Sequence, residues 1–368
     1  MKAFSSRVPL FAALIASSAV PASRAQTTAT TDPVGFITLN ATGQPAATSF
    51  SFKALGLTLA IDYQGAAERV GNLNGTTRDS LTDNEATWTN DQFNLPNATV
   101  GSATHYVEII RPVGAQNAAP GEGTTYDILR TDAASKTLTL EQEIASGVTA
   151  GAVFKVRKHW TISSVFGPAN SAGLAGGALE TADQILVFDS AANQYRIYFY
   201  QTQGSGTGWR LSTDLQTDAS LTVLYPDEGL VIRKQKGNGT AIVLAGAVKM
   251  GSTSIPVLPG TNLLGNVFAS PMTLDSSNLY NGNSATGLAG GNLGTADHVL
   301  IHNGVGYDIY YFELPNALNP SGGWRNASKP NQAGNLGSVP IPVGTSIIVK
   351  RNSATGFDWK VPQHPAAL

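Results

Sequence analysis

Beyond residue 32 the hydrophobic residues fall into short runs that alternate with polar residues, which is the period of a β-strand and not of a helix. The runs are rich in Val, Ile, Tyr and Phe. Turn-forming clusters of Gly, Pro, Asn and Asp separate them, as at Asn303-Gly304. Helical periodicity is almost absent, and only residues 140–145 have room for a single turn. The pattern predicts an all-β protein.

Two parts of the chain repeat each other. Residues 172–187 match residues 286–301 at a constant offset of 114. A period of roughly 110 residues is too long for a solenoid repeat, so the duplication predicts tandem β-sandwich-like units or two halves of one large sandwich. Further matches follow in the same order: 195–200 with 307–312, 208–210 with 323–325, and 229–234 with 344–351.

These boundaries predict a division of the chain. We expect a signal peptide at 1–25, an N-terminal β unit at 26–160, the first copy of the duplicated unit at 161–236, and the second copy with its leading strands at 237–368. Gly237-Asn238-Gly239 marks the break between the copies. The N-terminal unit has a turn at Asn74-Gly75 and candidate strands at 36–39, 104–110, 125–129, 137–140 and 153–156.

The first 25 residues have the three parts of a secretory signal peptide. Lys2 and Arg7 form a basic start, residues 8–20 are mostly apolar, and the small residues Ser23 and Ala25 suit cleavage before Gln26. The apolar run is shorter than the ~20 residues that a membrane-spanning helix needs. We therefore expect export, to the periplasm, the cell surface or the medium, and no transmembrane helix in the mature chain.

Charge and cysteine content narrow the range of partners and chemistry. Cleavage removes three basic residues and no acid, so 23 Lys and Arg become 20 against 25 Asp and Glu, a net charge of −5. This balance, without basic runs, argues against nucleic acid as a partner. The chain has no cysteine, which excludes thiol catalysis and thiolate metal sites.

No pattern predicts a cofactor or a metal centre. His298 and His302 are four apart in an apolar run that reads as a strand, where that spacing spans ~13 Å. One ion with bonds of about 2 Å cannot bridge it. Residues 275–283 carry oxygen ligands without EF-hand spacing, which favours an ordinary polar loop. The glycine-rich segment 287–291 lacks the ending of a P-loop, and no Gly-x-Ser-x-Gly elbow is present.

The repeated charged residues are candidates for a structural role. Asp183 and Asp297 lie in the repeated Thr-Ala-Asp, and Arg210 and Arg325 lie in the repeated Gly-Trp-Arg. A catalytic acid in each copy is one reading. We prefer an ion pair within each copy, or an aspartate that caps a turn by accepting from backbone N–H groups, because folding contacts must be kept in both copies.

Aromatic side chains at matching places are the candidate ligand-binding residues. On an exposed strand face their rings would stack on sugar rings, whereas on a buried face they would form a sandwich core. The sequence leaves both readings open. The six are Tyr198, Tyr200, Trp209, Tyr310, Phe312 and Trp324.

Four segments together resemble a known family. They are residues 32–36, 88–93, 158–166 with Lys158-His159-Trp160-Thr161, and 182–187. The resemblance is to a paralogous family of exported, functionally uncharacterised β-rich proteins of Verrucomicrobia and related bacteria, and it covers nearly the whole mature chain. It implies an envelope or extracellular destination and no activity. Gln184 corresponds to His298 in the second copy, so that polar position is not fixed.

The function that we expect is therefore that of an exported, non-enzymatic surface or extracellular protein. Its role would be structural, or the binding of a cell-surface glycan or another envelope protein. The alternative is a secreted polysaccharide-active enzyme with a carboxylate pair that the sequence does not reveal. An outer-membrane β-barrel is the third candidate. The sequence does not predict the oligomeric state.

Overall fold

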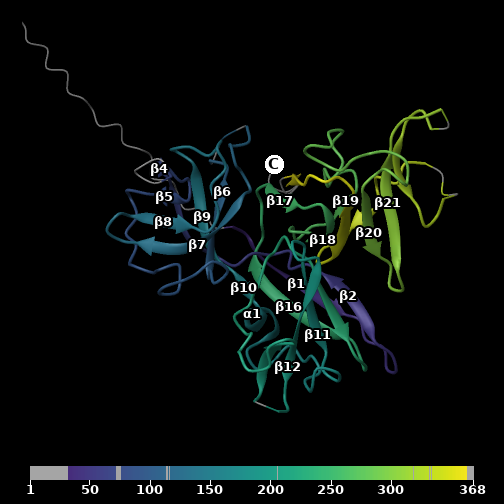
Figure 1. Cartoon of the computed structure of the whole chain (residues 1–368), viewed down its shortest axis with the longest axis horizontal. Coiled ribbons are helices and arrows are strands. Elements are labelled where there is room, and N and C mark those ends of the chain that lie inside the picture. The colour runs from purple at the N-terminus through teal and green to yellow at the C-terminus, as the bar shows by residue number, and fades with distance from the viewer. Residues whose placement is uncertain are drawn as a thin grey trace, which may run out of the picture. The chain divides into compact units, whose positions relative to one another are not determined.

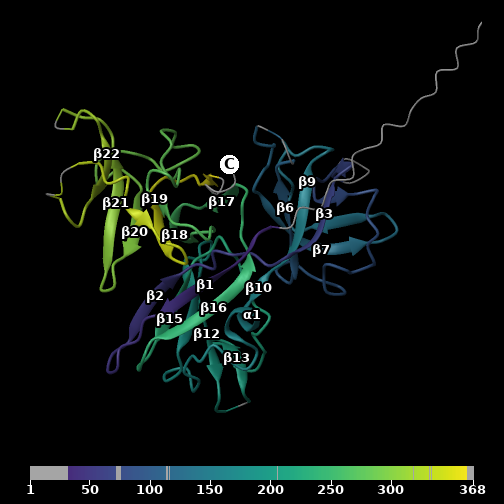
Figure 2. The ribbon, with the colours of Figure 1, turned by 180° about the vertical axis from the view of Figure 1, so that it is seen from behind.

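The computed structural model describes residues 32–362, except 72–75, 113, 114, 116, 205, 318, 331 and 333. The signal-peptide prediction and the turn at Asn74-Gly75 lie outside the described residues. The prediction of an all-β fold is confirmed: among the described residues, one short helix accompanies 25 strands in several antiparallel sheets (Figures 1 and 2). Within the described part of the chain, no helix has the length and apolar character needed to span a membrane.

A seven-stranded sheet occupies residues 61–158. Its outer pair β3 and β9 brings Ile61 opposite Arg157, so the chain enters and leaves this sheet at neighbouring points. Its core is built on fully buried side chains such as Val107, Ile128 and Phe154. In spatial order the strands are β3 (Ile61–Ala66), β9 (Val153–Lys158), β6 (His105–Ile110), β7 (Thr125–Asp132), β8 (Thr137–Leu140), β5 (Ser80–Thr82) and β4 (Arg69–Val70).

Two five-stranded sheets correspond strand for strand. In each, three strands that follow one another in the chain lie side by side, and the next long strand joins on the far side of the first of them. The first sheet runs β13 (Gly208–Leu211), β12 (Gln194–Gln201), β11 (Gln184–Asp189), β15 (Leu230–Lys234) and β2 (Ser49–Lys53). The second runs β22 (Gly323–Asn326), β21 (Tyr307–Glu313), β20 (His298–His302), β24 (Ser346–Arg351) and β18 (Gly260–Gly265).

Two-stranded ribbons accompany both sheets in the same way. In each copy the first strand pairs with the last strand and forms a long ribbon. A short ribbon in each copy pairs the strand that precedes the central strand of the sheet in the chain with the strand that precedes the central strand's other neighbour, β15 or β24. The long ribbons are β1 (Val34–Ala41) with β16 (Thr240–Ala247) and β17 (Thr253–Val257) with β25 (Phe357–Val361). The short ones are β10 (Trp160–Thr161) with β14 (Val223–Leu224) and β19 (Met272–Thr273) with β23 (Pro340–Ile341).

This pairing draws the unit boundaries differently from the sequence-based division. β1 and β2, which we assigned to the N-terminal unit, pair with β16 and β15, and β16 in turn belongs with the first sheet and not with the second copy. The first copy therefore consists of residues 34–53 and 160–247, the second of 253–361, and the seven-stranded sheet (the insert, 61–158) interrupts the first. Local turn signals cannot predict that β1 belongs with β16, because the two paired strands lie about 200 residues apart in the chain.

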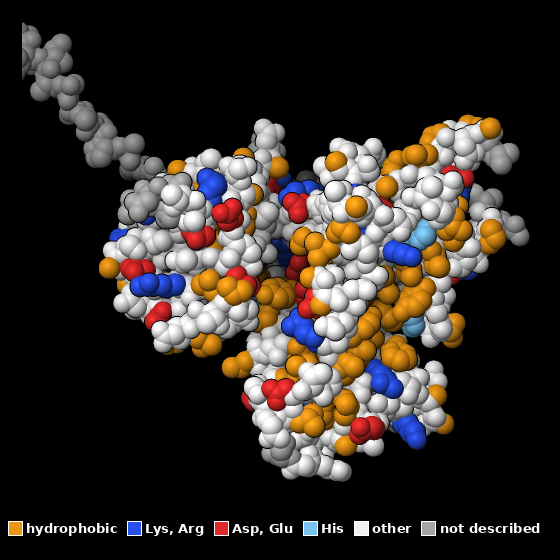
Figure 3. Space-filling model, in the orientation of Figure 1, with side chains coloured by type: hydrophobic (Ala, Val, Ile, Leu, Met, Phe, Trp, Pro, Cys, Tyr) orange, Lys and Arg blue, Asp and Glu red, His pale blue; other side chains and the backbone are white. Residues whose placement is uncertain are grey.

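The alternation of each central strand explains how the sheets pack. In β11, Ile185 and Val187 point into the core of the first copy, while Leu186 and Phe188 point the other way. That second face meets Leu263 and Ile348 of the second sheet. Figure 3 shows hydrophobic side chains gathered over β2 and β20, where the two sheets approach each other. Each sheet therefore buries apolar side chains on both faces.

The one described helix lies elsewhere than expected. Residues 140–145 end a strand and continue as a bend, while α1 spans Ile162–Phe166. A capping box starts α1: Thr161 accepts from the backbone of Ser164, and the Ser164 side chain accepts from the backbone N–H of Thr161. The second copy repeats this box between Thr273 and Ser276. Such a box stabilises one helical turn in a segment without helical periodicity.

Candidate functional site

The repeated aromatic residues lie mainly in the cores of the two copies. Trp209 and Trp324 are each 1% exposed, and Tyr198 and Tyr310 are buried beside them. The indole N–H of Trp209 donates to the carbonyl of Gly167 at 2.9 Å. Rings in this position have no free face for a sugar. Of the two readings left open by the sequence, the structure places these four residues in the core.

The remaining two repeated aromatics are half-buried and pack on these tryptophans. Tyr200 meets Trp209 edge-on with ring centroids 5.2 Å apart, and Phe312 meets Trp324 in the same way at 5.8 Å. The outer face of Phe312 is covered by the ring of Tyr280, stacked at 3.5 Å. These two residues extend the cores towards the surface, and Phe312 has rings against it on two sides.

The repeated aspartates have a structural role in both copies. The carboxylate of Asp183 accepts from the ammonium of Lys234 at 2.6 Å and from the backbone N–H groups of Ala175 and Gln235. The ion pair and the capping that the sequence predicted as alternatives are therefore both present. The arrangement ties the loop before β11 to the end of β15, and neither oxygen is free to act on a ligand.

The repeated arginines take no part in these ion pairs. The guanidinium of Arg210 donates to the carbonyl groups of Leu215 and Trp209. The guanidinium of Arg325 donates to Glu313 at 2.9 Å. Both hold the loops that follow their strands, so their conservation between the copies reflects local folding and not a shared site with the aspartates.

The histidine pair and the polar loop have partners within the protein. His298 contacts the carbonyl of Leu293 at 2.9 Å, and the ring of His302 stacks on Phe52 with centroids 4.9 Å apart. In the loop at 275–283, the amide of Asn281 donates to Thr286. Among the described residues no group of three or more His, Asp and Glu is placed to hold a metal ion.

A cluster of ionisable residues joins the insert to the first copy and to the segment that follows it. We call Glu108, Asp127, His159, Tyr225 and Lys249 the junction cluster. The Glu108 carboxylate on β6 of the insert contacts the ammonium of Lys249, which follows β16 of the first copy. Burial alone would raise the pKa of Glu108, but Lys249 and the guanidinium of Arg157 hold it at about 2. Glu108 is thus an anion at any ordinary pH, and its charge is used to bind the first copy.

The insert holds the start of the described chain through a second set of charges. Arg157 donates to Asp32, and the ammonium of Lys155 lies 2.7 Å from the same carboxylate. The guanidinium of Arg157 also donates to the carbonyl of Leu59 at 2.9 Å and lies 3.2 Å from Glu108. The fully buried Arg157 therefore connects three parts of the chain. They are the segment before β1, the segment that enters the insert, and the sheet of the insert itself.

The second half of the junction cluster is a chain of hydrogen bonds centred on Asp127. Its two carboxylate oxygens contact Nε2 of His159 at 2.9 Å and the hydroxyl of Tyr225 at 2.6 Å. Burial and the neighbouring carboxylate raise the pKa of the Tyr225 hydroxyl. His159 is 4% exposed, between the rings of Tyr106 and Tyr225. Its Nδ1 has no hydrogen-bond partner among the described residues.

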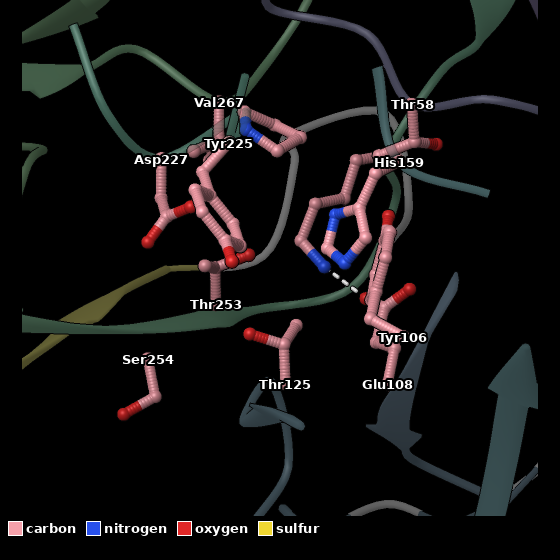
Figure 4. A pocket seen from close by; sticks show the side chains of 12 residues that line it. Thr58, Tyr106, Glu108, Thr125, His159, Tyr225, Asp227, Thr253, Ser254 and Val267 are labelled. Carbon is pink, nitrogen blue, oxygen red and sulfur yellow. Dashed lines mark hydrogen bonds and ion pairs between the residues drawn. The ribbon is translucent and has the colours of Figure 1, made fainter. Parts of the chain in front are cut away.

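The cavity beside these residues is small. Figure 4 shows His159 and Tyr106 on one side of it and Tyr225 and Asp227 on the other. Thr253 of the second copy also lines it, so all three parts of the chain contribute. Its volume is about 30 Å³, which leaves room for about two water molecules. No sugar ring fits there, and Glu108, Lys249 and His159 around it are already paired with other residues of the chain.

Two acidic residues beside the cavity differ from the rest. Asp227 and Glu228 are half-buried and form no ion pair with another described residue. Burial raises the pKa of Asp227, and burial together with Asp227 raises that of Glu228 to about 8. Their backbone joins the two copies, because Gly265 donates to the carbonyl of Asp227 at 2.8 Å. Glu228 is therefore protonated at neutral pH.

One exposed face stands out by its composition. We call the outward side chains of the β1–β16 ribbon the outer strip. Val34, Phe36 and Val243 on it are 82%, 76% and 65% exposed. The remaining members are Thr38, Asn40, Ala241 and Ala245, all exposed, so no member carries a charge.

The matching face of the second copy has a different character. The register of both ribbons places Val243 where the second copy has Lys360, and Ala241 where it has Asp358. Asn40 corresponds to Pro256. Charged residues and proline are the usual protection of exposed strands. The second ribbon has this protection and the first lacks it.

Neither the junction cluster nor the outer strip was among the sequence-predicted sites. The junction residues come from distant parts of the chain, 98 positions apart for Asp127 and Tyr225, and no local pattern connects them. For the strip a signal was available: residues 34–39 and 241–247 are apolar or small at nearly every position. A strand with apolar residues on both faces is either buried on both or leaves one face available for contact.

Comparisons with protein-family models, curated proteins and solved structures find no match.

Proposed function

We propose that the protein is an exported, non-enzymatic structural protein of the cell surface or extracellular space, and that it acts by protein–protein contact through the outer strip. The observation that carries this proposal is the exposure of Val34, Phe36 and Val243 on one uncharged ribbon face. Exposed apolar side chains that are contiguous and not scattered are typical of an interaction surface.

The second copy supports this reading as an internal comparison. A ribbon with the same pairing exposes Pro256, Asp358 and Lys360, so the fold does not require an apolar outer face. The two ribbons cover equivalent cores, so packing inside the molecule does not explain why one outer face is apolar and the other charged. We attribute this difference to what each outer face contacts outside the molecule.

The junction cluster supports a non-catalytic role. Glu108, Lys249, Asp127 and His159 are the groups with the chemistry for catalysis, and each one is bound to a partner on another part of the chain. Their net effect is to hold the insert against the first copy beside a cavity of about 30 Å³. A protein partner is also favoured over a glycan, because Trp209 and Trp324 lie in the cores. The leader at 1–25 supports export.

The second candidate is a polysaccharide-active enzyme, and one observation favours it. Glu228 has its pKa raised to about 8 beside Asp227, as a general acid of a glycosidase requires. One fact opposes it: the adjacent cavity, which Asp227 lines, has a volume of about 30 Å³ and does not accommodate a sugar ring.

The test separates the two candidates with one set of proteins. Purified residues 26–368 are incubated with envelope fractions of the producing organism and sedimented, and are assayed for release of reducing ends from a panel of polysaccharides. We expect retention by the envelope that Val243→Lys abolishes, and no hydrolysis. The control is Val305→Lys, because Val305 is 98% exposed in a turn far from the strip in sequence and charge there should leave retention unchanged.

Two results would overturn the proposal. One is hydrolysis that Glu228→Gln abolishes while the fold is kept. The other is equal retention of the wild type and of Val243→Lys.

A further inference from the structure

We infer that the partner of the outer strip is a second copy of this chain, in a closed two-fold dimer. This inference rests on the proposed function, because it names the partner of the same face. The argument begins with charge: the strip contains no ionisable side chain over the full paired length of β1 and β16. Any partner that covers it must itself be uncharged there, since a charge buried against an apolar face without a counterion is strongly unfavourable.

The strip satisfies this requirement for itself. A two-fold axis places the same patch on both partners, so uncharged residues meet uncharged residues. Its relief also suits self-packing, because large and small residues alternate across the ribbon: Phe36 lies opposite Ala245, and Val243 lies opposite Thr38. A large side chain of one copy can therefore occupy the space above a small one of the other.

The second ribbon cannot serve as the partner face. It exposes Asp358 and Lys360 at the positions that are Ala241 and Val243 in the strip, and contact with the strip would remove both charges from water. Head-to-tail contacts between the two ribbons would produce a ring or an open filament, whereas strip-to-strip contact closes after two copies. The charges on the second ribbon thus favour a dimer over a polymer.

The area of the strip sets the expected affinity. Eight residues of β1 at about 3.4 Å each give a length of ~27 Å, and two strands about 4.8 Å apart give a width of ~10 Å. The contact is then roughly 270 Å² per copy, well below the about 800 Å² per partner of a standard interface. We therefore expect a weak dimer, with a dissociation constant in the micromolar range or above.

The experiment measures the mass of residues 26–368 by sedimentation velocity from about 1 μM to about 500 μM, a range that covers such weak interfaces. The wild type should move from monomer towards dimer and no further. The variant with Ala241→Asp and Val243→Lys, which gives the strip the charges of the second ribbon, should weaken dimerisation by at least about tenfold. Its thermal unfolding midpoint should equal that of the wild type, which shows that the fold is intact. Val305→Lys is the matched control and should dimerise normally.

Because the chain has no cysteine, a disulfide provides a second readout that does not depend on a disruptive charge. Val243→Cys should form a covalent dimer under mild oxidation, and Val305→Cys should not. A wild type that stays monomeric throughout, a charged variant that dimerises as well as the wild type, or growth beyond the dimer would overturn the inference.

The inference and the proposed function fail in different ways. Envelopes from a strain that lacks this chain distinguish them, because they contain other partners but no second copy. Strip-dependent retention by those envelopes would overturn the self-partner and leave the proposed function intact. A dimer in solution that is never retained by any envelope would overturn the envelope role and leave the dimer.

Discussion

The guanidinium of Arg351 lies 2.6 Å from the carboxylate of Asp297, and both side chains are almost completely buried. The ammonium of Lys234 has the same relationship to Asp183 in the first copy, also at 2.6 Å. In each copy the aspartate additionally accepts from two backbone N–H groups, one before its own strand and one after the strand of its partner. The pair therefore lies where β11 pairs with β15 in the first copy and β20 with β24 in the second, and it ties the loop before one strand to the end of the other.

Replacing this aspartate should destabilise the second copy strongly. Asp297→Asn leaves the charge of Arg351 buried without a counterion, and breaking such a pair typically costs about 3–5 kcal/mol of unfolding free energy. Urea unfolding monitored by tryptophan fluorescence measures the change. Asp132→Asn is the control, since the Arg130–Asp132 pair is exposed and should leave the midpoint nearly unchanged. A loss as small as that of the control would contradict a structural role for Asp297.

The repeated tryptophans should behave as core residues. Trp324 is 1% exposed and packs with Tyr310 and Val349, so Trp324→Ala should lower the unfolding free energy by about 3–5 kcal/mol. Differential scanning calorimetry gives the measurement. Phe36→Ala removes an aromatic ring that is 76% exposed, and it should change the midpoint little. If Trp324→Ala kept full stability but lost binding to a glycan, the ring would belong to a site after all.

Much of the strand content could be predicted from alternation alone. The expected run 137–140 is β8 as observed, 307–312 falls within β21, and 195–200 falls within β12. In β8 the buried Leu138 and Leu140 alternate with threonines, which a period of two reveals. In β12 and β21 the run of Ile, Tyr and Phe indicates a strand, although the burial does not alternate regularly. The position of the insert could not be predicted, because it depends on β1 pairing with β16. Such long-range pairing leaves no trace in the local pattern of either strand.

The candidate site was predictable only in part. Comparison of the repeats located Asp183 and Asp297, because a folding contact needed in both copies preserves its residue types. It did not reveal that their partners are Lys234 and Arg351, since Lys and Arg differ between the copies. The junction residues occur once each, so no repeat could indicate them, and tertiary contacts alone bring them together.

The raised pKa of Glu228 predicts a pH dependence of stability. Its folded pKa of about 8 lies above the ordinary value of 4.5, so between these values the folded state binds one proton more than the unfolded state. Stability should therefore fall as pH rises from about 4.5 to about 8 and then level off. Glu228→Gln removes this penalty, so the variant should exceed the wild type in stability at pH 8 and match it at pH 4.

Urea midpoints of both proteins at the two pH values measure this difference. Glu143→Gln is the matched control, because Glu143 is exposed and should show no such gap. Glu108 acts in the opposite sense: with its pKa held at about 2, it contributes stability above pH 4.5 that is lost as pH falls towards 2. A wild type and Glu228→Gln variant with equal midpoints at pH 8 would contradict the raised pKa.

The insert should be separable from the first copy. Ile61 lies opposite Arg157, so the two ends of the insert are neighbours. The first copy also holds its own ends together without the insert, because the indole N–H of Trp160 donates to the carbonyl of Leu57 at 2.9 Å. The insert has a separate core. We therefore expect residues 60–159 to fold alone, and the remaining chain to fold when a short Gly-Ser linker joins Leu59 to Trp160.

Far-UV circular dichroism and cooperative thermal unfolding of both proteins test this expectation. The shortened chain should be somewhat less stable than the full chain, because Lys249 and Tyr225 lose Glu108 and Asp127, but these polar groups then become hydrated and impose no buried-charge penalty. Tyr225→Phe in the full chain is the useful comparison, since it removes only the 2.6 Å bond to Asp127 and should cost about 1–3 kcal/mol. A shortened chain that unfolds without cooperativity, while residues 60–159 fold, would mean that the first copy needs the insert to complete its own fold.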